Sequence, residues 1–538
     1  MLANRERVYI YDTTLRDGAQ TFGVDFSVDE KITIAQGLAA LGVDFIEGGW
    51  PGANPTDTAF FKRLADVDPD TTQRLVAFGK TAALKKNAAD DAGLMEVIAS
   101  PAPHVCLVAK AWDYQVTVAL GGTLEENLTS ITASFALAKE HGKQTLMCDL
   151  EHFFDGYKAN PAYALACAEA AVAGGATWLV MCDTNGGTLP PEISDIVPAV
   201  VRAICGKFPK CQLGIHTHND AECAVANSLL AVAAGARQVQ GTLTGLGERC
   251  GNASLTSTIP TLLLKPFFRD RFRTEMVDEA LPKLGELSKK IDAMLNRPSN
   301  PAQAYFGANA FVTKAGLHAS AILKDPRTYE HVPPESVGNA RKIIMADQGG
   351  RSNTLAALKH LGFDLDPRDE RVVALTDEIK RLTEYGYAFD QAEASLLLLA
   401  KRRLQHVPDF FKLLSYDTGH AKGHHLGADL AGNLVEAWVK MSVRHTPYEG
   451  QAVAASSAEA LMLAMKAALP PFADKLRDVT IADMSLRQLT LGGETTHRII
   501  LTLRAGARTF KTLGAGINPT EAECEALRDG LVCVLMGA

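Results

Sequence analysis

The sequence predicts an α/β fold built from three successive parts. Over the first 265 or so of its 538 residues, short apolar runs rich in β-branched residues alternate with Ala- and Leu-rich helical stretches. They recur at roughly 25–40 residues, the length of one strand–helix unit. Eight such units within about 250 residues are typical of a (β/α)8 TIM barrel. We therefore expect a barrel at 1–265, a mostly helical linker subdomain at 266–410 and a small α+β domain at 411–538.

Eight short segments are the strand candidates of the barrel. They are residues 8–12, 43–49, 74–79, 104–110, 143–149, 177–183, 212–218 and 237–243. The stretches between them have helical composition and helical boundary signals. After the first strand, Ser27 is followed three residues later by Glu30, which predicts a capping box, and Gly42 predicts the helix end.

The two later regions differ from the barrel in composition and in the periodicity of their apolar residues. Residues 266–410 are helical and charged, but the polar, glycine-bearing segment 306–343 has little periodicity, and long irregular segments of this kind are often functional. From about residue 430, strands are again followed by helices. The helix openings SSAEAL and NPTEAEC occupy matching places, which indicates an internal duplication. A His- and Gly-rich stretch at 416–432 is the predicted linker to this domain.

Composition excludes several classes of protein. A net charge of −8 argues against a general nucleic-acid binder. No apolar run approaches the ~20 residues of a membrane-spanning helix, and the N-terminus lacks the apolar region of a signal peptide. Ten cysteines are scattered along the chain without a C-x-x-C pair. We therefore expect a cytoplasmic protein with reduced thiols and no nucleic-acid or membrane partner.

Polar or charged residues stand at or just beyond the ends of the predicted strands, the face where barrels hold their active sites. The strongest pattern is HTHND, at the end of the seventh strand. Since strand side chains alternate between faces, His216 and His218 point the same way and can share a divalent metal. The strand-end residues are Arg16, Asp17, Glu47, Lys80, Lys110, Asp149, Glu151, Asp183, Thr184, His216, His218, Glu248 and Asn252.

Two imidazoles need further ligands, usually oxygen. Asp17 could supply one, or it could be a turn-forming Asp before Gly18, and its position in the chain fits both. The turn GLGERCGNAS could present Asn252 to the metal; its GxGxxxG spacing and the lack of a downstream acidic residue do not favour a dinucleotide loop. Mixed His, Asp and Asn ligands suit Mn²⁺, Zn²⁺, Co²⁺ or Mg²⁺. Arg16 beside them would face an anionic substrate.

Five segments, in this order, carry a family resemblance: DTTLRDGAQ, IEGGWPG, CDTNGGTLP, HTHND and GLGERCGNA. They resemble the DRE-TIM metallolyase family, in particular its Claisen-condensing branch of isopropylmalate, homocitrate and citramalate synthases. The resemblance covers essentially the whole chain. Within the branch, IEGGWPGANPTD, CDLEHFFDGYKANP and CDTNGGTLP look most like citramalate synthases, since isopropylmalate synthases more often carry an AGFP-type second strand.

The resemblance implies roles for individual residues. The metal ligands would be Asp17, His216, His218 and Asn252. Arg16 would contact the keto-acid oxygen and Thr184 the keto-acid carboxylate, with Gln20 and Glu47 as further substrate-binding residues. Glu151 matches a family acid near the reacting carbon, although a solvated loop carboxylate is the alternative. In AGLHAS, His318 matches a catalytic His that reaches over the barrel mouth, with Tyr329 as its companion.

The implied reaction joins acetyl-CoA and pyruvate to give (R)-citramalate and CoA, in isoleucine biosynthesis, with Glu151 or His318 as the base. Lys80 and Lys110 would meet the anionic substrates. The family's C-terminal domain implies a homodimer and feedback inhibition by isoleucine. Three alternatives remain: a 2-isopropylmalate or homocitrate synthase that uses a larger 2-oxo acid, a metal-dependent aldolase or acyl-CoA lyase, and a non-catalytic amino-acid sensor. The intact Arg, Asp, His and Asn set argues against the sensor.

Overall fold

The computed structural model describes residues 5–344, 351–366, 368–420 and 434–537. The chain divides into two compact units. Met1–Phe311 and Val332–Ala340 make up the first unit, and Val312–His331 and Arg341–Ala538 make up the second. None of the helices in these described ranges is both long and apolar enough to cross a membrane. The predicted boundaries at residues 265 and 410 stay a prediction.

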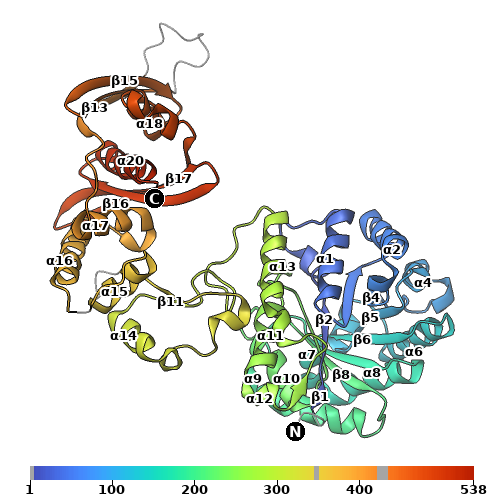
Figure 1. Ribbon diagram of the computed structural model, residues 1–538. Helices are drawn as coiled ribbons and strands as arrows, with labels where there is room; N and C mark the ends of the chain where they lie inside the picture. Colours follow the sequence, from blue (N-terminus) through green and yellow to red (C-terminus); the bar gives the residue numbers. More distant parts are fainter. Residues whose placement is uncertain (1–4, 345–350, 367, 421–433, 538) are drawn as a thin grey trace. The chain divides into compact units, whose positions relative to one another are not determined.

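The described part of the first unit holds a closed barrel of eight parallel strands (Figure 1). Each predicted segment overlaps one strand, so the predicted barrel is confirmed. Neighbours in the sequence are neighbours in the barrel, and the last strand closes onto the first, with Tyr9 opposite Gln238. The strands are β2 (Tyr9–Asp12), β3 (Phe45–Gly49), β4 (Leu75–Lys80), β5 (His104–Lys110), β6 (Thr145–Glu151), β7 (Trp178–Asp183), β8 (Gln212–Thr217) and β9 (Gln238–Gly241).

Helices surround the strands. In α1 the predicted capping box is present, with Ser27 accepting from the Glu30 amide and Glu30 accepting from the Ser27 amide; the helix ends before Gly42, whose φ is 82°. The longer helices are α1 (Val28–Ala40), α2 (Pro55–Val67), α4 (Ala92–Ala99), α6 (Leu124–Glu140), α8 (Pro161–Gly174), α9 (Pro190–Val200), α10 (Ala224–Ala234), α11 (Leu255–Leu264) and α13 (Leu281–Met294). Shorter elements are β1 (Glu6–Arg7), α3 (Pro69–Thr72), α5 (Asp113–Val118), α7 (Phe153–Ala159), α12 (Pro266–Arg269) and β10 (Phe272–Arg273).

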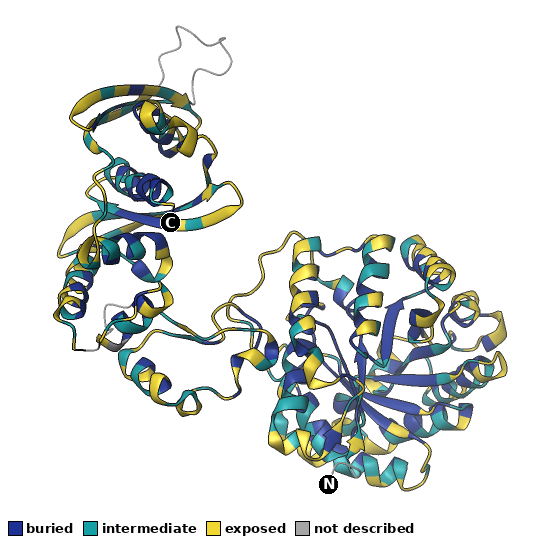
Figure 2. Ribbon diagram, in the orientation of Figure 1, coloured by how far each residue is buried: buried dark blue, intermediate teal, exposed yellow. Residues whose placement is uncertain are grey.

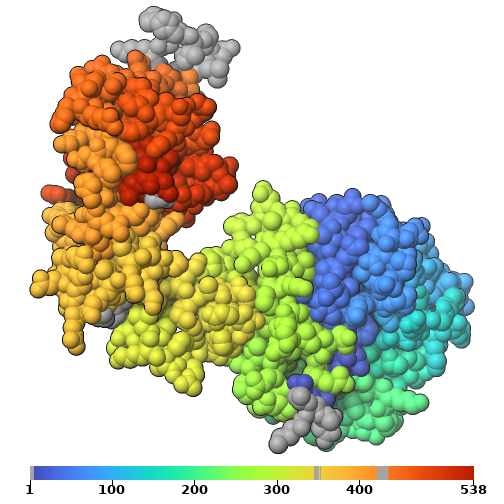
Figure 3. Space-filling model, in the orientation of Figure 1, coloured from blue at the N-terminus to red at the C-terminus, as the bar shows by residue number. Residues whose placement is uncertain are grey.

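The barrel is packed on both sides of its wall. The strands are buried, whereas the helices expose their outer faces (Figure 2). One apolar core lies between strands and helices. In the space-filling view, the blue, cyan and green segments of the barrel lie side by side at its surface (Figure 3). A second apolar cluster is formed by side chains of the barrel strands, among them Tyr11, Phe45, Met147 and Trp178. Barrel interiors are filled by such side chains, so a ligand is expected at an end of the barrel.

The second unit contains the predicted helices and the C-terminal domain. β11 (Val312–Thr313) pairs with β12 (Lys342–Ile343), and the helices α14 (Gly316–Lys324), α15 (Arg351–His360), α16 (Glu370–Glu384) and α17 (Glu393–Leu404) belong to this part. The strands β13 (Lys412–His420), β14 (Val435–Val443) and β15 (Thr446–Ala454) precede α18 (Ser457–Ala467). After α19 (Ala473–Leu476), the strands β16 (Val479–Leu491), β17 (Glu494–Ala505) and β18 (Arg508–Gly516) precede α20 (Pro519–Leu535). Two antiparallel three-stranded sheets, each followed by a helix, match the predicted duplication.

The predicted linker is wrong in its first part. Residues up to His420 belong to β13, which pairs with β14 from Lys412 opposite Ser442 to His420 opposite Val435. Tyr416 and Thr418 are more buried than their neighbours, a strand alternation that the following Gly and His residues concealed in the sequence. The remainder of the predicted linker, 421–432, lies outside the described residues.

Candidate active site at the barrel mouth

A cavity of about 670 Å³ lies at the carboxyl ends of the barrel strands. Its volume is in the range of small-molecule sites. The predicted site residues that line it are Arg16, Asp17, Gln20, Glu151, Thr184, His216 and His218, together with Lys80 and Lys110. Trp50, Phe78 and Arg249, which were not predicted, also line it. The cavity therefore brings together residues that are up to 233 positions apart in the chain, from Arg16 to Arg249.

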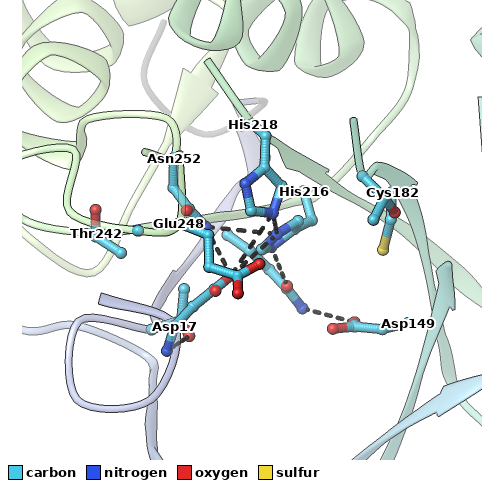
Figure 4. Close-up of polar contacts among 12 residues, drawn as sticks. Asp17, Asp149, Cys182, His216, His218, Thr242, Glu248 and Asn252 are labelled. Atoms are coloured by element: carbon cyan, nitrogen blue, oxygen red, sulfur yellow. Dashed lines mark hydrogen bonds and ion pairs between the residues drawn. The ribbon is translucent and has the colours of Figure 1, made fainter. Parts of the chain in front are cut away.

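Three of the four predicted metal ligands form one buried group. Asp17, His216 and His218 each offer a ligand atom, and these atoms lie within 4.8 Å of one another. Both imidazoles point to the same side, as the strand alternation predicts, with 3.2 Å between their Nε2 atoms. Asp17 Oδ2 lies 3.3 Å from His216 Nε2 and 3.9 Å from His218 Nε2. Figure 4 shows these side chains converging with Asn252.

Asn252 completes the group through a short antiparallel bridge to His218. Its Nδ2 donates to Asp17 Oδ2 at 2.8 Å. Its Oδ1 is buried and has no hydrogen-bond partner among the described residues. A buried acceptor without a hydrogen-bond partner needs an explanation. A carboxylate, an amide oxygen and two imidazole nitrogens are ligands that divalent metals accept. Asp17, His216, His218 and Asn252, called the metal group below, therefore fit a divalent cation.

The glycine-rich turn before Asn252 is shaped for this packing. Gly247 has a φ of 153°, and a Cβ built on it would lie 2.0 Å from Asn252 Oδ1. Only glycine allows the backbone to approach the amide so closely. The glycine spacing of GLGERCG thus has a structural reason at the metal group.

Electrostatics favour the metal-binding forms of Asp17 and His218. Burial alone would raise the pKa of Asp17, but Arg16 and His216 lower it well below its usual range. Burial and the neighbouring His216 lower the pKa of His218 to about 3. For His216, burial acts to lower the pKa, but the carboxylate of Asp17 raises it overall. An ionised carboxylate and a neutral imidazole are the states that coordinate cations.

Arg16 is held in place from two sides. Its Nε donates to Glu47 Oε2 at 2.7 Å, and its Cζ lies 3.9 Å from the centre of the Phe78 ring. Glu47 is fully buried and also accepts from the Tyr11 hydroxyl at 2.5 Å and from the Thr13 hydroxyl. Glu47 is not among the residues that line the cavity, so its contacts favour holding Arg16; its predicted role in substrate binding stays a prediction.

Glu151 ends strand β6, and Thr184 directly follows the end of the neighbouring strand β7. Glu151, the last residue of β6, pairs with Lys110, the last residue of β5. The Thr184 hydroxyl oxygen accepts from the His152 amide at 2.8 Å. Because its oxygen already accepts, the hydroxyl has its proton available for a ligand in the cavity.

His318 and Tyr329 belong to the second unit. Their rings lie 4.2 Å apart between centroids at an interplanar angle of 32°, so the two residues predicted as companions are in contact. His318 is on α14, and Tyr329 follows a short turn. Their action at the barrel cavity stays a prediction.

Gln240 was missed by the sequence-based predictions. It lies on β9 and contacts the predicted ligand His216, with 3.0 Å between His216 Nδ1 and Gln240 Oε1. The available signal was the pattern QVQ in a strand that is otherwise apolar. Two amides spaced by two residues share one face of a strand, and buried amides need partners.

Comparisons with known proteins agree with the geometry. The HMGL-like family model matches residues 7–276, and the model described as homocitrate synthase post-HMGL domain-like matches 306–386. An (R)-citramalate synthase from Aquifex aeolicus is 43% identical over 99% of this chain and 98% of its own length. One from Geobacter sulfurreducens is 40% identical over 97% of each. A 2-isopropylmalate synthase from Microcystis aeruginosa is 29% identical over 98% of this chain and 96% of its own length.

The full-length matches and the barrel-mouth residues lead to the same group of proteins. The chain belongs to the HMGL-like, or DRE-TIM metallolyase, family, and within it to the citramalate synthases.

Proposed function

We propose that this chain is an acyltransferase that condenses acetyl-CoA with pyruvate and releases (R)-citramalate and CoA, in isoleucine biosynthesis. The observation that carries the proposal is the buried group of Asp17, His216, His218 and Asn252 beside Arg16 in the barrel cavity. The greater likeness to citramalate synthases than to 2-isopropylmalate synthases supports pyruvate over a larger 2-oxo acid.

Asp17, His216, His218 and Asn252 would hold the divalent cation, for which Mn²⁺, Zn²⁺, Co²⁺ and Mg²⁺ are the candidates. Such a cation, when bound, supplies Lewis acidity toward the keto and carboxylate oxygens of the keto acid. The low pKa of Asp17 keeps this ligand ionised without a cation.

Arg16 and Thr184 would bind and orient pyruvate. The Arg16 guanidinium is fixed by Glu47 and Phe78 before substrate arrives, so it presents a positive charge where negative charge develops on the keto oxygen. The Thr184 hydroxyl, with its oxygen already accepting from the His152 amide, would donate its proton to the pyruvate carboxylate. Gln20 lines the same cavity and would add a further polar contact.

A base must remove a proton from the acetyl methyl group of acetyl-CoA. Glu151 and His318 are the two candidates, because a carboxylate and an imidazole both serve as general bases. Glu151 lines the cavity and pairs with Lys110. His318, with Tyr329 against its ring, would act from the segment that follows the barrel, on the proton of the methyl group or of the water that cleaves the thioester. Lys80 and Lys110 would attract the anionic substrates.

The C-terminal domain would regulate the enzyme. We assign it feedback inhibition by isoleucine and a share in a homodimer, on the family resemblance and on the duplicated sheet-and-helix architecture. All ten cysteines are free thiols, which supports a cytoplasmic location. Adding isoleucine to the condensation assay tests the feedback inhibition. Measuring the mass of the full chain in solution by light scattering tests the homodimer.

CoA release followed with a thiol reagent tests the reaction and its alternatives. The purified chain, acetyl-CoA and a divalent cation are assayed with pyruvate, 2-oxoisovalerate and 2-oxoglutarate. The proposal expects the highest kcat/KM with pyruvate. Preference for 2-oxoisovalerate would indicate an isopropylmalate synthase and preference for 2-oxoglutarate a homocitrate synthase, whereas no release with any keto acid would favour a lyase or a sensor.

Substitution separates the two candidate bases. If His318 is the base, His318→Ala should lose most turnover while cation binding is retained, and near-normal turnover would refute that role. Glu151→Gln keeps the size of the side chain and removes its basicity, so it makes the matching test for Glu151. The thermal unfolding midpoint of each variant serves as the control for folding.

A further inference from the structure

His216 is engaged at both ring nitrogens. Its Nε2 faces the metal group, 3.3 Å from Asp17 Oδ2. Its Nδ1 lies 3.0 Å from Oε1 of Gln240, on the neighbouring strand β9. Gln240 is fully buried, and His216 is 5% exposed. Water therefore competes little for this contact, and the amide decides how the imidazole is oriented.

The orientation of the Gln240 amide is itself fixed. Its Nε2 donates to Asp149 Oδ1 at 3.1 Å and to Gln238 Oε1 at 3.3 Å. Two acceptors on this side require the nitrogen to face them, since an amide oxygen there would have no donor. The Gln240 oxygen must then face His216.

The consequence for His216 is a defined tautomer. An amide oxygen only accepts, so the proton of a neutral His216 must reside on Nδ1. Nε2 then carries the lone pair and points it into the metal group. His218 differs, because its buried Nδ1 has no hydrogen-bond partner within the described parts of the chain. The protein thus presets one imidazole of the pair and not the other.

We propose that Gln240, locked by Asp149, is a positioning residue that sets the tautomer and the ring orientation of His216 for cation binding. The inference rests on the metal site of the proposed function. Partners behind a ligating histidine, when removed, typically cost about 10–100-fold in metal affinity. Through the hydrogen bond between them, Asp149 on β6 and Gln240 on β9 would both contribute to the affinity for the cation.

Titration of the metal-stripped full-length protein with Co²⁺ tests this role. The visible absorption of the bound ion reports affinity and ligand geometry without any turnover. Gln240→Met keeps the length of the side chain and removes both polar atoms, so we expect Co²⁺ affinity to fall by about 10–100-fold with an altered spectrum. Asp149→Asn keeps an acceptor for the Gln240 amide, so we expect a loss well below the roughly 10–100-fold of Gln240→Met. Gln238→Met is the comparison on the same strand: it removes the more distant of the two acceptors of the Gln240 amide, but it leaves Asp149 in place and does not touch His216, so it should lose much less affinity than Gln240→Met.

Thermal unfolding of the stripped proteins separates a positioning role from a structural one. A lower midpoint shared by Gln240→Met and Gln238→Met, with only Gln240→Met weak in Co²⁺ binding, supports the proposal. Equal Co²⁺ affinity and spectrum in Gln240→Met and the parent protein would overturn it, as would equal losses in Gln240→Met and Gln238→Met. No stoichiometric Co²⁺ binding by the parent protein would instead refute the metal site of the proposed function, and this inference with it.

Discussion

Replacing Gly247 by alanine should disable the metal group while the barrel stays folded. The added Cβ would lie 2.0 Å from Asn252 Oδ1, whereas carbon and oxygen atoms that are not bonded to each other rarely approach closer than 3.0 Å. Asn252 or the turn must therefore move by about 1 Å, and displacements of this size at a reacting centre cost on the order of 100-fold in rate. Metal ligands tolerate much less, about 0.2 Å.

Gly23→Ala is the matched control. Gly23 also has a positive φ, 75°, but a Cβ there would meet nothing within 4 Å. Both variants carry the strain of alanine at a positive φ, about 1–2 kcal/mol. Gly247→Ala adds the clash with Asn252, so its free energy of unfolding should fall by more than that of Gly23→Ala. Only Gly247→Ala should lose cation affinity, which calorimetric titration measures, and only in this variant should kcat fall, by about 100-fold. Cation affinity and kcat equal to those of Gly23→Ala would refute the assignment of Asn252 to the metal group.

Further predictions address the other residues of the site and the stability of the fold. Glu47→Gln replaces a charged acceptor of Arg16 by a neutral one, which costs about 1 kcal/mol, so kcat should fall about fivefold with little change in KM for acetyl-CoA. Thr184→Val removes the proposed donor to pyruvate and should raise KM for pyruvate by roughly 10–100-fold in steady-state assays, because hydrogen bonds to charged groups contribute about 1.5–3 kcal/mol. Chelation should lower the thermal midpoint, since a cation at 100 times its Kd stabilises by about 2.7 kcal/mol. Burial lowers the pKa of Lys143 from 10.5 to about 8; the unfolded chain then binds more protons between these values, so stability against urea should rise with pH there, and Lys143→Met should abolish that rise.

The barrel and the convergence of the candidate metal ligands could be predicted because both depend on local patterns. Strand segments repeat with the length of a strand–helix unit, and each predicted segment overlaps a strand. The alternation of side chains along β8 places His216 and His218 on one side, and 3.2 Å separates their Nε2 atoms. The closed barrel then brings the strand ends together, so Asp17 and Asn252 meet the histidines although 235 positions separate them.

Features that depend on contacts distant in the sequence were harder to predict. Gln240 resembles an ordinary strand residue until the fold places it against His216 and Asp149. Residues 416–420 of strand β13 were predicted to be part of a linker, because the pairing of β13 with β14 depends on residues beyond a glycine-rich stretch. Glu47 was predicted to bind substrate, but its contacts to Arg16, Tyr11 and Thr13 depend on the packing of β2 against β3.

The most direct test of the central claim identifies the product formed from acetyl-CoA and pyruvate by the parent protein and by Asp17→Asn. This variant keeps the shape of the side chain and removes the carboxylate of the metal group. Chiral chromatography should detect (R)-citramalate, one molecule for each CoA released, from the parent protein and almost none from the folded variant. No citramalate from the parent protein, or citramalate formed at the parent rate by Asp17→Asn, would contradict the account.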